Sequence, residues 1–272
     1  MVHEFIWVIT KSPDGSHEVA REAARELGGQ VLEVPRGLYQ AWNSGIAQAT
    51  GDFIYISTIG DTITPEGLNA LWNCLRKTAA DVVFSPPIIS SATGTNLKHA
   101  RHWPVFAFSK FLNQFAGLRI PKEKAFLLQI LSGASGLLGS CASCLFRALI
   151  LKSRPFPTDH YHYGDTAWTY QNLADVTLAF HPEPVANFQI HNAEVSRIVD
   201  KKQIYNLIGQ IAIYLPLPLT HTTHSYTLGS FHIDRIRDPH PKFGWWWIPD
   251  AWRARWKRNR AKSVLIQALE QP

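Results

Sequence analysis

Strand signals and helix signals alternate along the first third of this 272-residue chain. Short apolar, β-branched runs predict buried strands, and segments with apolar residues at helical spacing separate them. The strands are predicted at residues 5–9, 30–34, 52–57 and 80–84. Such alternation is typical of a doubly wound, mainly parallel α/β sheet. Ligands of such sheets bind beyond the carboxyl ends of the strands.

Two of the intervening helices carry local signals of their own. Thr64 and Pro65 supply an N-cap and a proline at the first helical position, so a helix is predicted to begin there. In the preceding helix, Ala41 and Gly45 are small residues four positions apart. We expect that helix to pack closely against a sheet through this small-residue face.

The second half of the chain has a less regular pattern. A helix is predicted after Pro121. Later strands are predicted at residues 144–146, 176–180 and 185–190, and later helices at 164–173 and 204–215. We therefore divide the chain into an α/β domain, residues 1–200, and a helical C-terminal extension, residues 201–272.

Composition limits the compartment and the class of protein. Hydrophobic residues make up 46% of the chain, which is ample for a packed core. The three cysteines, Cys74, Cys141 and Cys144, are too few for a disulfide framework or a four-ligand zinc site, and their odd number fits a reducing compartment. No export signal or membrane-spanning run is recognisable. We expect buried cysteines in a cytoplasmic protein.

Positive charge is concentrated near the C-terminus. Residues 250–272 hold six basic and two acidic side chains, hence +4 of the chain's formal charge of +6. Trp252 and Trp256 share a face if this tail is helical. Residues 245–262 therefore suit an anionic membrane surface, at which each cation contributes ~1 kcal/mol, and predict a peripheral protein at the inner face of the cell membrane. Tryptophans packed on the domain are an equally supported alternative, and such a local charge does not indicate nucleic-acid binding.

Two carboxylates lie at positions that suit a metal ligand or a catalytic base. Asp61 lies on a loop after a predicted strand, and Asp165 opens a predicted helix. A loop carboxylate can hold a divalent cation on a phosphate leaving group, and a carboxylate at a helix start can accept a proton. Each alone is more often a turn former or a cap. His160 and His162 with Asp165 and His191 would form a metal-dependent hydrolase site, although surface or hydrogen-bonding histidines are the simpler interpretation.

A longer pattern resembles a known family. Residues 37–56 read GLYQAWNSGIAQATGDFIYI, similar to the segment G-x-Y-x-A-x-N-x-G-I-x-x-A-x-G-x-x-I of family-two inverting glycosyltransferases, which have the GT-A fold. Gly60 and Asp61 stand at the family's paired aspartates, and residues 80–83 at its A-D-V-V strand. Residues 164–168 resemble its E-D-x-x-x-W motif and residues 182–191 its P-E-x-L-A-x-Y-x-x-H stretch. The resemblance covers about the first 200 residues.

The resemblance implies a function. A sugar would pass with inversion from a nucleotide-sugar donor to a saccharide or lipid-linked acceptor. Asp165 would deprotonate the acceptor hydroxyl, Asp61 would bind Mn²⁺ or Mg²⁺ on the diphosphate, and His191 would approach the diphosphate or the metal. The residues implied to bind the donor are Ser12, Asp14, Gly37, Asn43, Gly60 and Asp61.

The sequence also departs from the family. Gly60 replaces the first aspartate of the metal motif, Gly164 replaces the usual glutamate, and Lys11 precedes the S-x-D-G turn where a nucleoside-binding aspartate is usual. The chain begins one βα unit later than the family pattern. These departures leave open an altered donor, metal independence, or a catalytically inactive glycosyltransferase-like protein that binds sugar or nucleotide or acts as a scaffold.

Overall fold

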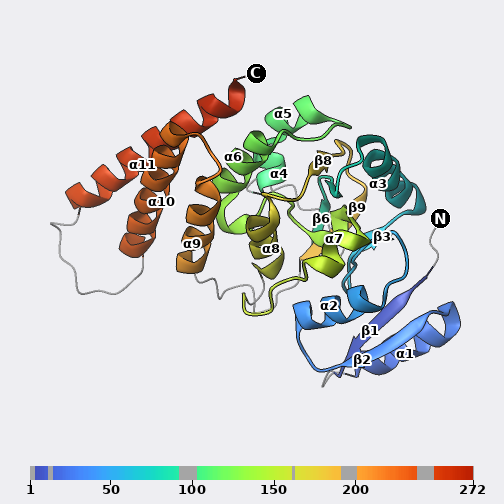
Figure 1. Ribbon diagram of the computed structural model, residues 1–272. Coiled ribbons are helices and arrows are strands. Elements are labelled where there is room, and N and C mark those ends of the chain that lie inside the picture. Colours follow the sequence, from blue (N-terminus) through green and yellow to red (C-terminus); the bar gives the residue numbers. More distant parts are fainter. Residues whose placement is uncertain are drawn as a thin grey trace.

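The computed structural model describes residues 4–11, 15–91, 103–160, 163–190, 201–237 and 248–271. Strands and helices alternate through the N-terminal part, and long helices form the opposite end of the molecule (Figure 1). Strands β1 (Ile6–Thr10) and β2 (Gln30–Val34) lie at one end with two helices. Helices α9 (Lys201–Ala212), α10 (Leu217–Arg237) and α11 (Ile248–Glu270) lie at the other (Figure 1). The remaining strands lie between them.

The N-terminal unit has the order β1 (Ile6–Thr10), α1 (Ser16–Leu27), β2 (Gln30–Val34) and α2 (Leu38–Gln48). The two strands are parallel, with Ile6 opposite Gln30 and Thr10 opposite Val34. Helix α2 packs on β1. A Cβ atom on Gly45 would lie only 2.9 Å from Cγ2 of Val8, which confirms the predicted close packing of the small-residue face.

Seven further strands form two more sheets. Their bounds are β3 (Phe53–Ile54), β4 (Thr62–Ile63), β5 (Val82–Phe84), β6 (Ile88–Ser91), β7 (Cys144–Arg147), β8 (Leu178–Phe180) and β9 (Ala186–Ile190). One sheet has the order β3-β7-β5-β8, and the other has the order β4-β9-β6. The β3/β7, β5/β7 and β4/β9 pairs are antiparallel, whereas β5/β8 and β6/β9 are parallel.

The predicted α/β fold with C-terminal helices is therefore present, with mixed strand directions and three separate sheets. The expectation of a mainly parallel sheet rested on a helix between successive strands. Strand β4 instead follows β3 through a turn, and β7 enters between β3 and β5 from a distant part of the chain. Strands of two or three residues are too short to show their direction in a sequence pattern.

Helix α3 (Pro65–Thr78) begins where the sequence predicts. The Thr64 side chain accepts a hydrogen bond from the N–H of Gly67 at 3.1 Å and so caps the helix. Leu71 and Leu75 are fully buried in a cluster with residues of β5, β7 and β8. The helix thus covers one face of the four-stranded sheet.

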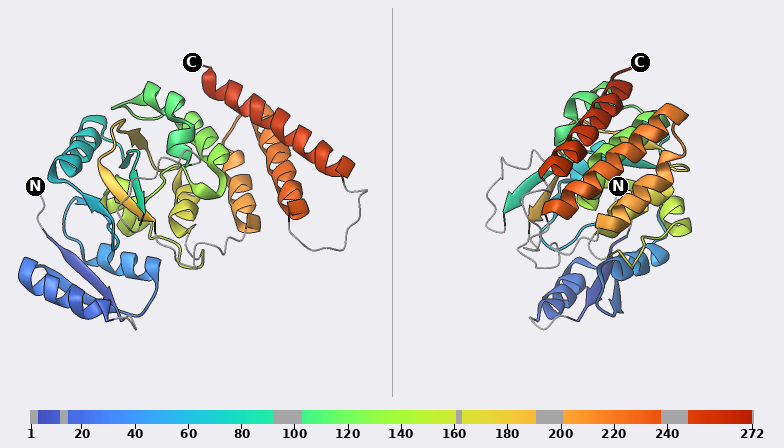
Figure 2. Two further views of the ribbon diagram at one scale, coloured as in Figure 1. Left: turned by 180° about the vertical axis from the view of Figure 1, so that it is seen from behind. Right: turned by 90° about the vertical axis from the view of Figure 1, so that its left-hand side faces the viewer.

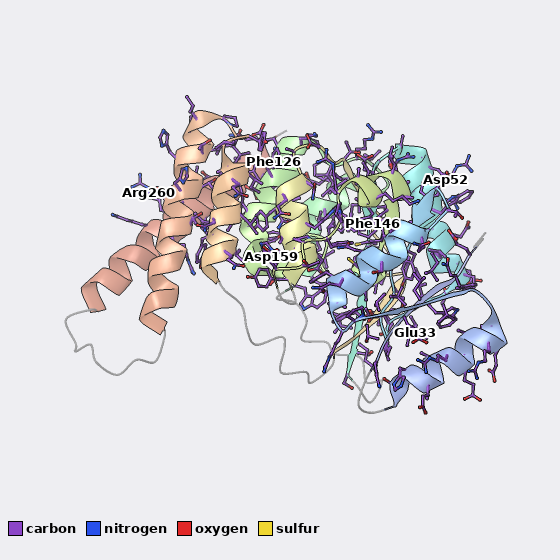
Figure 3. All side chains as sticks on the ribbon, turned by 60° about the horizontal axis from the view of Figure 1, so that its bottom comes forward. Glu33, Asp52, Phe126, Phe146, Asp159 and Arg260 are labelled. Carbon is purple, nitrogen blue, oxygen red and sulfur yellow. The ribbon has the colours of Figure 1, made fainter. Side chains whose placement is uncertain are left out.

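The larger core lies on the other side of that sheet. Helix α2 contributes to it, and so do α4 (Pro104–Ala107), α5 (Ser109–Leu112), α6 (Lys122–Ser132), α7 (Ala148–Ser153) and α8 (Gly164–Asn172). Phe146 lies in the packed interior (Figure 3), with its ring edge-on to both Phe156 and Trp168. Trp168 is 1% exposed. This aromatic cluster anchors the start of α8, the helix that carries Asp165.

The C-terminal helices are α9 (Lys201–Ala212), α10 (Leu217–Arg237) and α11 (Ile248–Glu270). Helices α10 and α11 lie side by side as a hairpin (Figure 2). Leu265 and Leu269 of α11 are buried in the same core as Phe126 of α6, and Nζ of Lys124 donates to the carbonyl of Ala268 at 2.8 Å. The boundary at residue 200 stays a prediction: it separates two sequence patterns, and the core extends across it.

The structure also shows how the cysteines are placed and whether the described helices are apolar enough for a membrane. Cys74, Cys141 and Cys144 are all buried and unpaired with one another, as predicted. Among the described residues no helix is long and apolar enough to cross a membrane.

Candidate active site

Asp165 lies in the first turn of α8 with one carboxylate oxygen held from two sides. Its Oδ1 accepts hydrogen bonds from the Thr166 N–H at 2.7 Å and from the Tyr39 hydroxyl at 3.2 Å. The Thr169 hydroxyl donates to the Asp165 carbonyl at 3.0 Å. Within the described part of the chain, Oδ2 receives no hydrogen bond. One oxygen is therefore fixed, and the other has an unused acceptor position among the described residues.

The surroundings of Asp165 make it an unusually strong base for a carboxylate. Burial raises the pKa of Asp165 from 3.8 to about 6, although the hydrogen bonds from Thr166 and Tyr39 lower it in part. Burial raises a carboxyl pKa because it disfavours the charged form. At neutral pH the group is mostly ionised and still holds a proton far better than an ordinary aspartate, which suits general-base catalysis.

A small cavity adjoins the carboxylate. Its volume is ≈ 10 Å³, about the least that holds one water molecule. Its walls include Gly136, Cys141 and Phe156 together with Asp165 itself. Gly136 has φ 66°, and a Cβ there would lie 2.6 Å from the Thr166 hydroxyl oxygen. Glycine at this position therefore lets the loop approach the start of α8.

Tyr39 reaches Asp165 from α2, within the segment that resembles the glycosyltransferase motif. Its side chain is 2% exposed. The Phe156 ring stacks on it with centroids 6.0 Å apart, and Trp42 lies edge-on at 5.2 Å. A Cβ on Gly164 would lie 2.5 Å from the Tyr39 ring. Gly164, which departs from the family pattern, is thus the residue that makes room for Tyr39.

Asn43 and Gly37, both expected to bind the donor, have structural roles in this fold. The Asn43 amide donates to the Phe156 carbonyl at 2.8 Å and accepts from the Phe156 N–H at 2.9 Å. Gly37 caps the start of α2. A Cβ on Gly37 would come within 2.4 Å of Oε1 of Gln40. Contact of either residue with a donor stays a prediction.

Asp61 lies at the end of a tight turn that begins at Thr58. Its N–H donates to the Thr58 carbonyl at 3.0 Å, and the intervening Gly60 has φ 94°, a conformation that favours glycine. The Asp61 carboxylate accepts from the Thr58 hydroxyl at 2.6 Å and from the Gln189 N–H of β9 at 3.2 Å. The turn geometry thus accounts for glycine at the position of the family's first aspartate.

The metal-binding capacity of this site can be judged from its donors. Among the described residues no three His, Cys, Asp or Glu side chains are grouped as a metal cage. Asp61 is half-buried, and its carboxylate offers the hard oxygen atoms that divalent cations such as Mg²⁺ prefer. Mg²⁺ is often held by one carboxylate together with substrate phosphates. The residues present fit that arrangement.

Both predicted carboxylates lie close enough to the buried Cys141 for their charges to affect its thiol. The turn Cys141–Ser143 contacts β4 and β9, which hold Asp61 in place, and Cys141 also lines the Asp165 cavity. Burial raises the pKa of the Cys141 thiol well above its ordinary value, with further contributions from the charges of Asp165 and Asp61. The fold therefore brings together the predicted base and the predicted metal ligand.

The remaining predicted positions fall partly outside the described residues. Ser12, Asp14 and His191 lie outside the described residues. His160 pairs with the exposed Asp159, Nδ1 to Oδ1 at 2.7 Å, and His162 is also outside the described part. The described residues thus give no support to the alternative metal-dependent hydrolase site.

Comparison with known proteins decides the family. The model of glycosyl transferase family 2 matches residues 2–149. The chain belongs to this family. Family-two membership supports glycosyltransferase activity. A search of the curated proteins found no match.

Solved structures similar to this family-two chain include TarS of S. aureus. TarS residues 1–349 in complex with UDP-GlcNAc gives a TM-score of 0.58 at 14% identity, over 98% of this chain and 72% of that one. TarS residues 1–349 alone gives 0.55 at 14% identity, over 98% and 73%. At such identities the similarity shows the fold, and it confirms the predicted GT-A type.

Proposed function

We propose that this protein transfers a sugar from a nucleotide-sugar donor to a hydroxyl of a saccharide or lipid-linked acceptor, with inversion at the anomeric carbon. The observation that carries the proposal is the raised basicity of Asp165 together with the unused acceptor position on its Oδ2. Burial raises its pKa to about 6, and its Oδ2 has no donor in the described part of the molecule. A base for an alcohol needs this combination of basicity and an open oxygen.

The reaction is a single displacement. Asp165 Oδ2 accepts the proton of the acceptor hydroxyl while the hydroxyl oxygen forms a bond to the anomeric carbon. The bond from that carbon to the donor phosphate breaks, and the nucleoside diphosphate leaves with the electron pair. Attack opposite the leaving group inverts the anomeric centre. Asp165 then releases its proton to solvent.

The proposed role of Asp61 is to help the nucleoside diphosphate leave. Thr58 and Gln189 orient its carboxylate, and that carboxylate would hold Mn²⁺ or Mg²⁺. When bound, the cation neutralises charge on the departing diphosphate. The metal role of His191 and the donor contacts of Ser12, Asp14, Gly37, Asn43 and Gly60 rest on the resemblance alone.

The decisive experiment replaces the base. UDP-GlcNAc is the first donor to test, because the TarS structure contains it. With Mn²⁺ present, Asp165→Asn should lower sugar transfer or donor hydrolysis by about 10²- to 10⁴-fold, the usual contribution of a general base. Asp159→Asn is the matched control, since Asp159 is exposed and paired with His160. Equal rates in wild type and Asp165→Asn would remove Asp165 as the base.

A second function is favoured by one observation: Gly60 leaves Asp61 as a single carboxylate at the metal motif. We therefore keep, as the alternative, a glycosyltransferase-like protein that binds sugar or nucleotide, or acts as a scaffold, without transfer. Calorimetry with nucleoside diphosphates and their sugars separates the two proposals. Binding together with turnover supports the enzyme, binding without turnover supports the sugar- or nucleotide-binding protein, and absence of any binding supports the scaffold.

A membrane role for the tail is a separate proposal. Lys257, Arg260 and Lys262 of α11 are exposed, and Arg260 projects from the outer side of the helix (Figure 3). The side chains of Trp252 and Trp256 are not among those described. Truncation would also remove Leu265 from the core, so charge reversal is the cleaner test. A Lys257→Glu, Arg260→Glu, Lys262→Glu variant should lose co-sedimentation with anionic vesicles, and retained binding would contradict the proposal.

A further inference from the structure

Tyr39 and Asp165 are joined by a hydrogen bond across 126 residues of sequence. We propose that Tyr39 is a positioning residue of the reaction: its hydroxyl holds Asp165 Oδ1 so that Oδ2 faces the acceptor hydroxyl. This role rests on the proposed function of Asp165 as the base. Nothing in the sequence pattern alone pairs these two residues.

The Tyr39 ring is held tightly enough for such a role. Phe156 and Trp42 pack against it, and Gly164 closes the remaining side, where even a Cβ would be 2.5 Å from the ring. One helical turn further along α2, Asn43 makes two hydrogen bonds to the Phe156 backbone. The ring therefore has little freedom to turn, and its hydroxyl has a defined direction.

The hydroxyl stays protonated throughout the working range of an enzyme. Burial, and then the nearby charge of Asp165, raise the pKa of Tyr39 far above its ordinary value. A protonated phenol can donate to the carboxylate at any physiological pH. Tyr39 is therefore a permanent donor to Asp165 rather than a second proton carrier.

Among the described residues, the other titratable groups near Asp165 are neutral or engaged elsewhere. Burial raises the pKa of both the Cys141 and the Cys144 thiol, so neither carries charge at neutral pH. The Tyr163 hydroxyl donates to Gln203 at 2.7 Å, and His160 pairs with Asp159. The Tyr39 hydroxyl is thus a titratable donor that acts directly on Asp165.

This arrangement predicts a specific pH signature. A hydrogen bond to a carboxylate favours its charged form, so Tyr39→Phe should raise the Asp165 pKa further. The acidic limb of kcat/KM should then move up by about one pH unit, the worth of one such bond. At pH 5.5 the shifted pKa alone should make the variant about eightfold slower than wild type. Near pH 8 both bases are ionised, and the variant should still be slower, because Oδ2 has lost its orientation.

The experiment compares pH profiles of kcat/KM for wild type, Tyr39→Phe and Tyr170→Phe. Tyr170 is the matched control, because its buried hydroxyl donates to the Gln129 carbonyl at 2.9 Å instead of to Asp165. ¹³C NMR of the aspartate carboxyl carbons, with Asp165→Asn to assign the signal, measures the same shift without turnover. A moved limb and a moved NMR titration in Tyr39→Phe alone support the proposal.

The failing outcomes can be told apart. If Asp165→Asn is inactive while Tyr39→Phe keeps the wild-type limb, or slows equally at every pH, the positioning role is overturned and the base assignment stands. If Asp165→Asn is fully active, the proposed function itself falls. Trp42→Leu is a second variant in case Tyr39→Phe folds poorly. It removes the ring that lies edge-on to Tyr39 but keeps the Tyr39 hydroxyl, and it should move the limb in the same direction.

Discussion

The side-chain amide of Asn43 is bound at both ends by the backbone of Phe156, as donor at 2.8 Å and as acceptor at 2.9 Å. The two residues lie 113 positions apart. Through this contact α2 fixes the chain just before α8, and Phe156 in turn stacks on Tyr39. The asparagine of the family-like motif therefore organises the site from within the fold.

Asn43→Ala should destabilise the protein by about 1–3 kcal/mol, because two half-buried backbone groups of Phe156 lose their partner. Urea unfolding measures the change. Ser44→Ala is the control: its exposed hydroxyl bonds only to the carbonyl of Gln40 in the same helix, so its effect should stay within about 0.5 kcal/mol. Similar stability of the two variants would contradict the structural role of Asn43.

Gly60→Ala should lower stability by about 1–2 kcal/mol, since φ 94° is unfavourable for a residue with a Cβ atom. Gly209→Ala is the opposite case. Gly209 lies inside α9 with nothing near its Cβ position, and alanine should stabilise that helix by up to about 1 kcal/mol. Thermal unfolding of both variants checks the pair. Equal melting temperatures for Gly60→Ala and wild type would exclude strain at the turn.

Thr58→Val should raise the Mn²⁺ concentration for half-maximal activity by about tenfold, because its hydroxyl orients the Asp61 carboxylate at 2.6 Å. The neighbouring Thr62 is exposed on β4, so Thr62→Val should leave metal dependence unchanged. Metal titrations of transfer rate provide the measurement. An unchanged titration in Thr58→Val would show that Asp61 does not need this orientation for the metal.

The raised pKa of Asp165 also predicts how stability depends on pH. Its folded value of about 6 exceeds the ordinary 3.8, so the native state favours the protonated form. This contribution is fully present below about pH 4 and is lost as pH rises through about 6. Asp165→Asn should therefore be more stable than wild type at pH 7.5, by about 1–2 kcal/mol, and equal to it at pH 4. A constant difference across this range would contradict the pKa.

Much of the architecture could be predicted from local patterns. The cap formed by Thr64 and the close approach of Gly45 to Val8 appear as expected. Local signals succeed there because capping and small-residue packing depend on neighbours a few positions away. Strands β4 and β6 and the antiparallel direction of β7 were not predicted, because two- to four-residue strands take their order and direction from distant partners.

The candidate site could likewise be predicted from the sequence only in part. Asp61 and Asp165 could be named from the motif, and Tyr39 stood inside that motif without a role. Its match to the tyrosine of the family motif was the signal that the sequence offered. Tyr39 bonds to the Asp165 carboxylate, and Thr58 and Gln189 bond to that of Asp61. These contacts depend on which elements pack together, so no local pattern predicts them.

The sequence by itself determined the family, the alternating strands and helices of the first third of the chain, and the identity of the two carboxylates, because these follow from residue type and short spacing. Only the tertiary structure decided that Asp165 is a stronger base than an ordinary aspartate. That property comes from burial among groups that lie more than a hundred residues apart along the chain, and no local pattern encodes it.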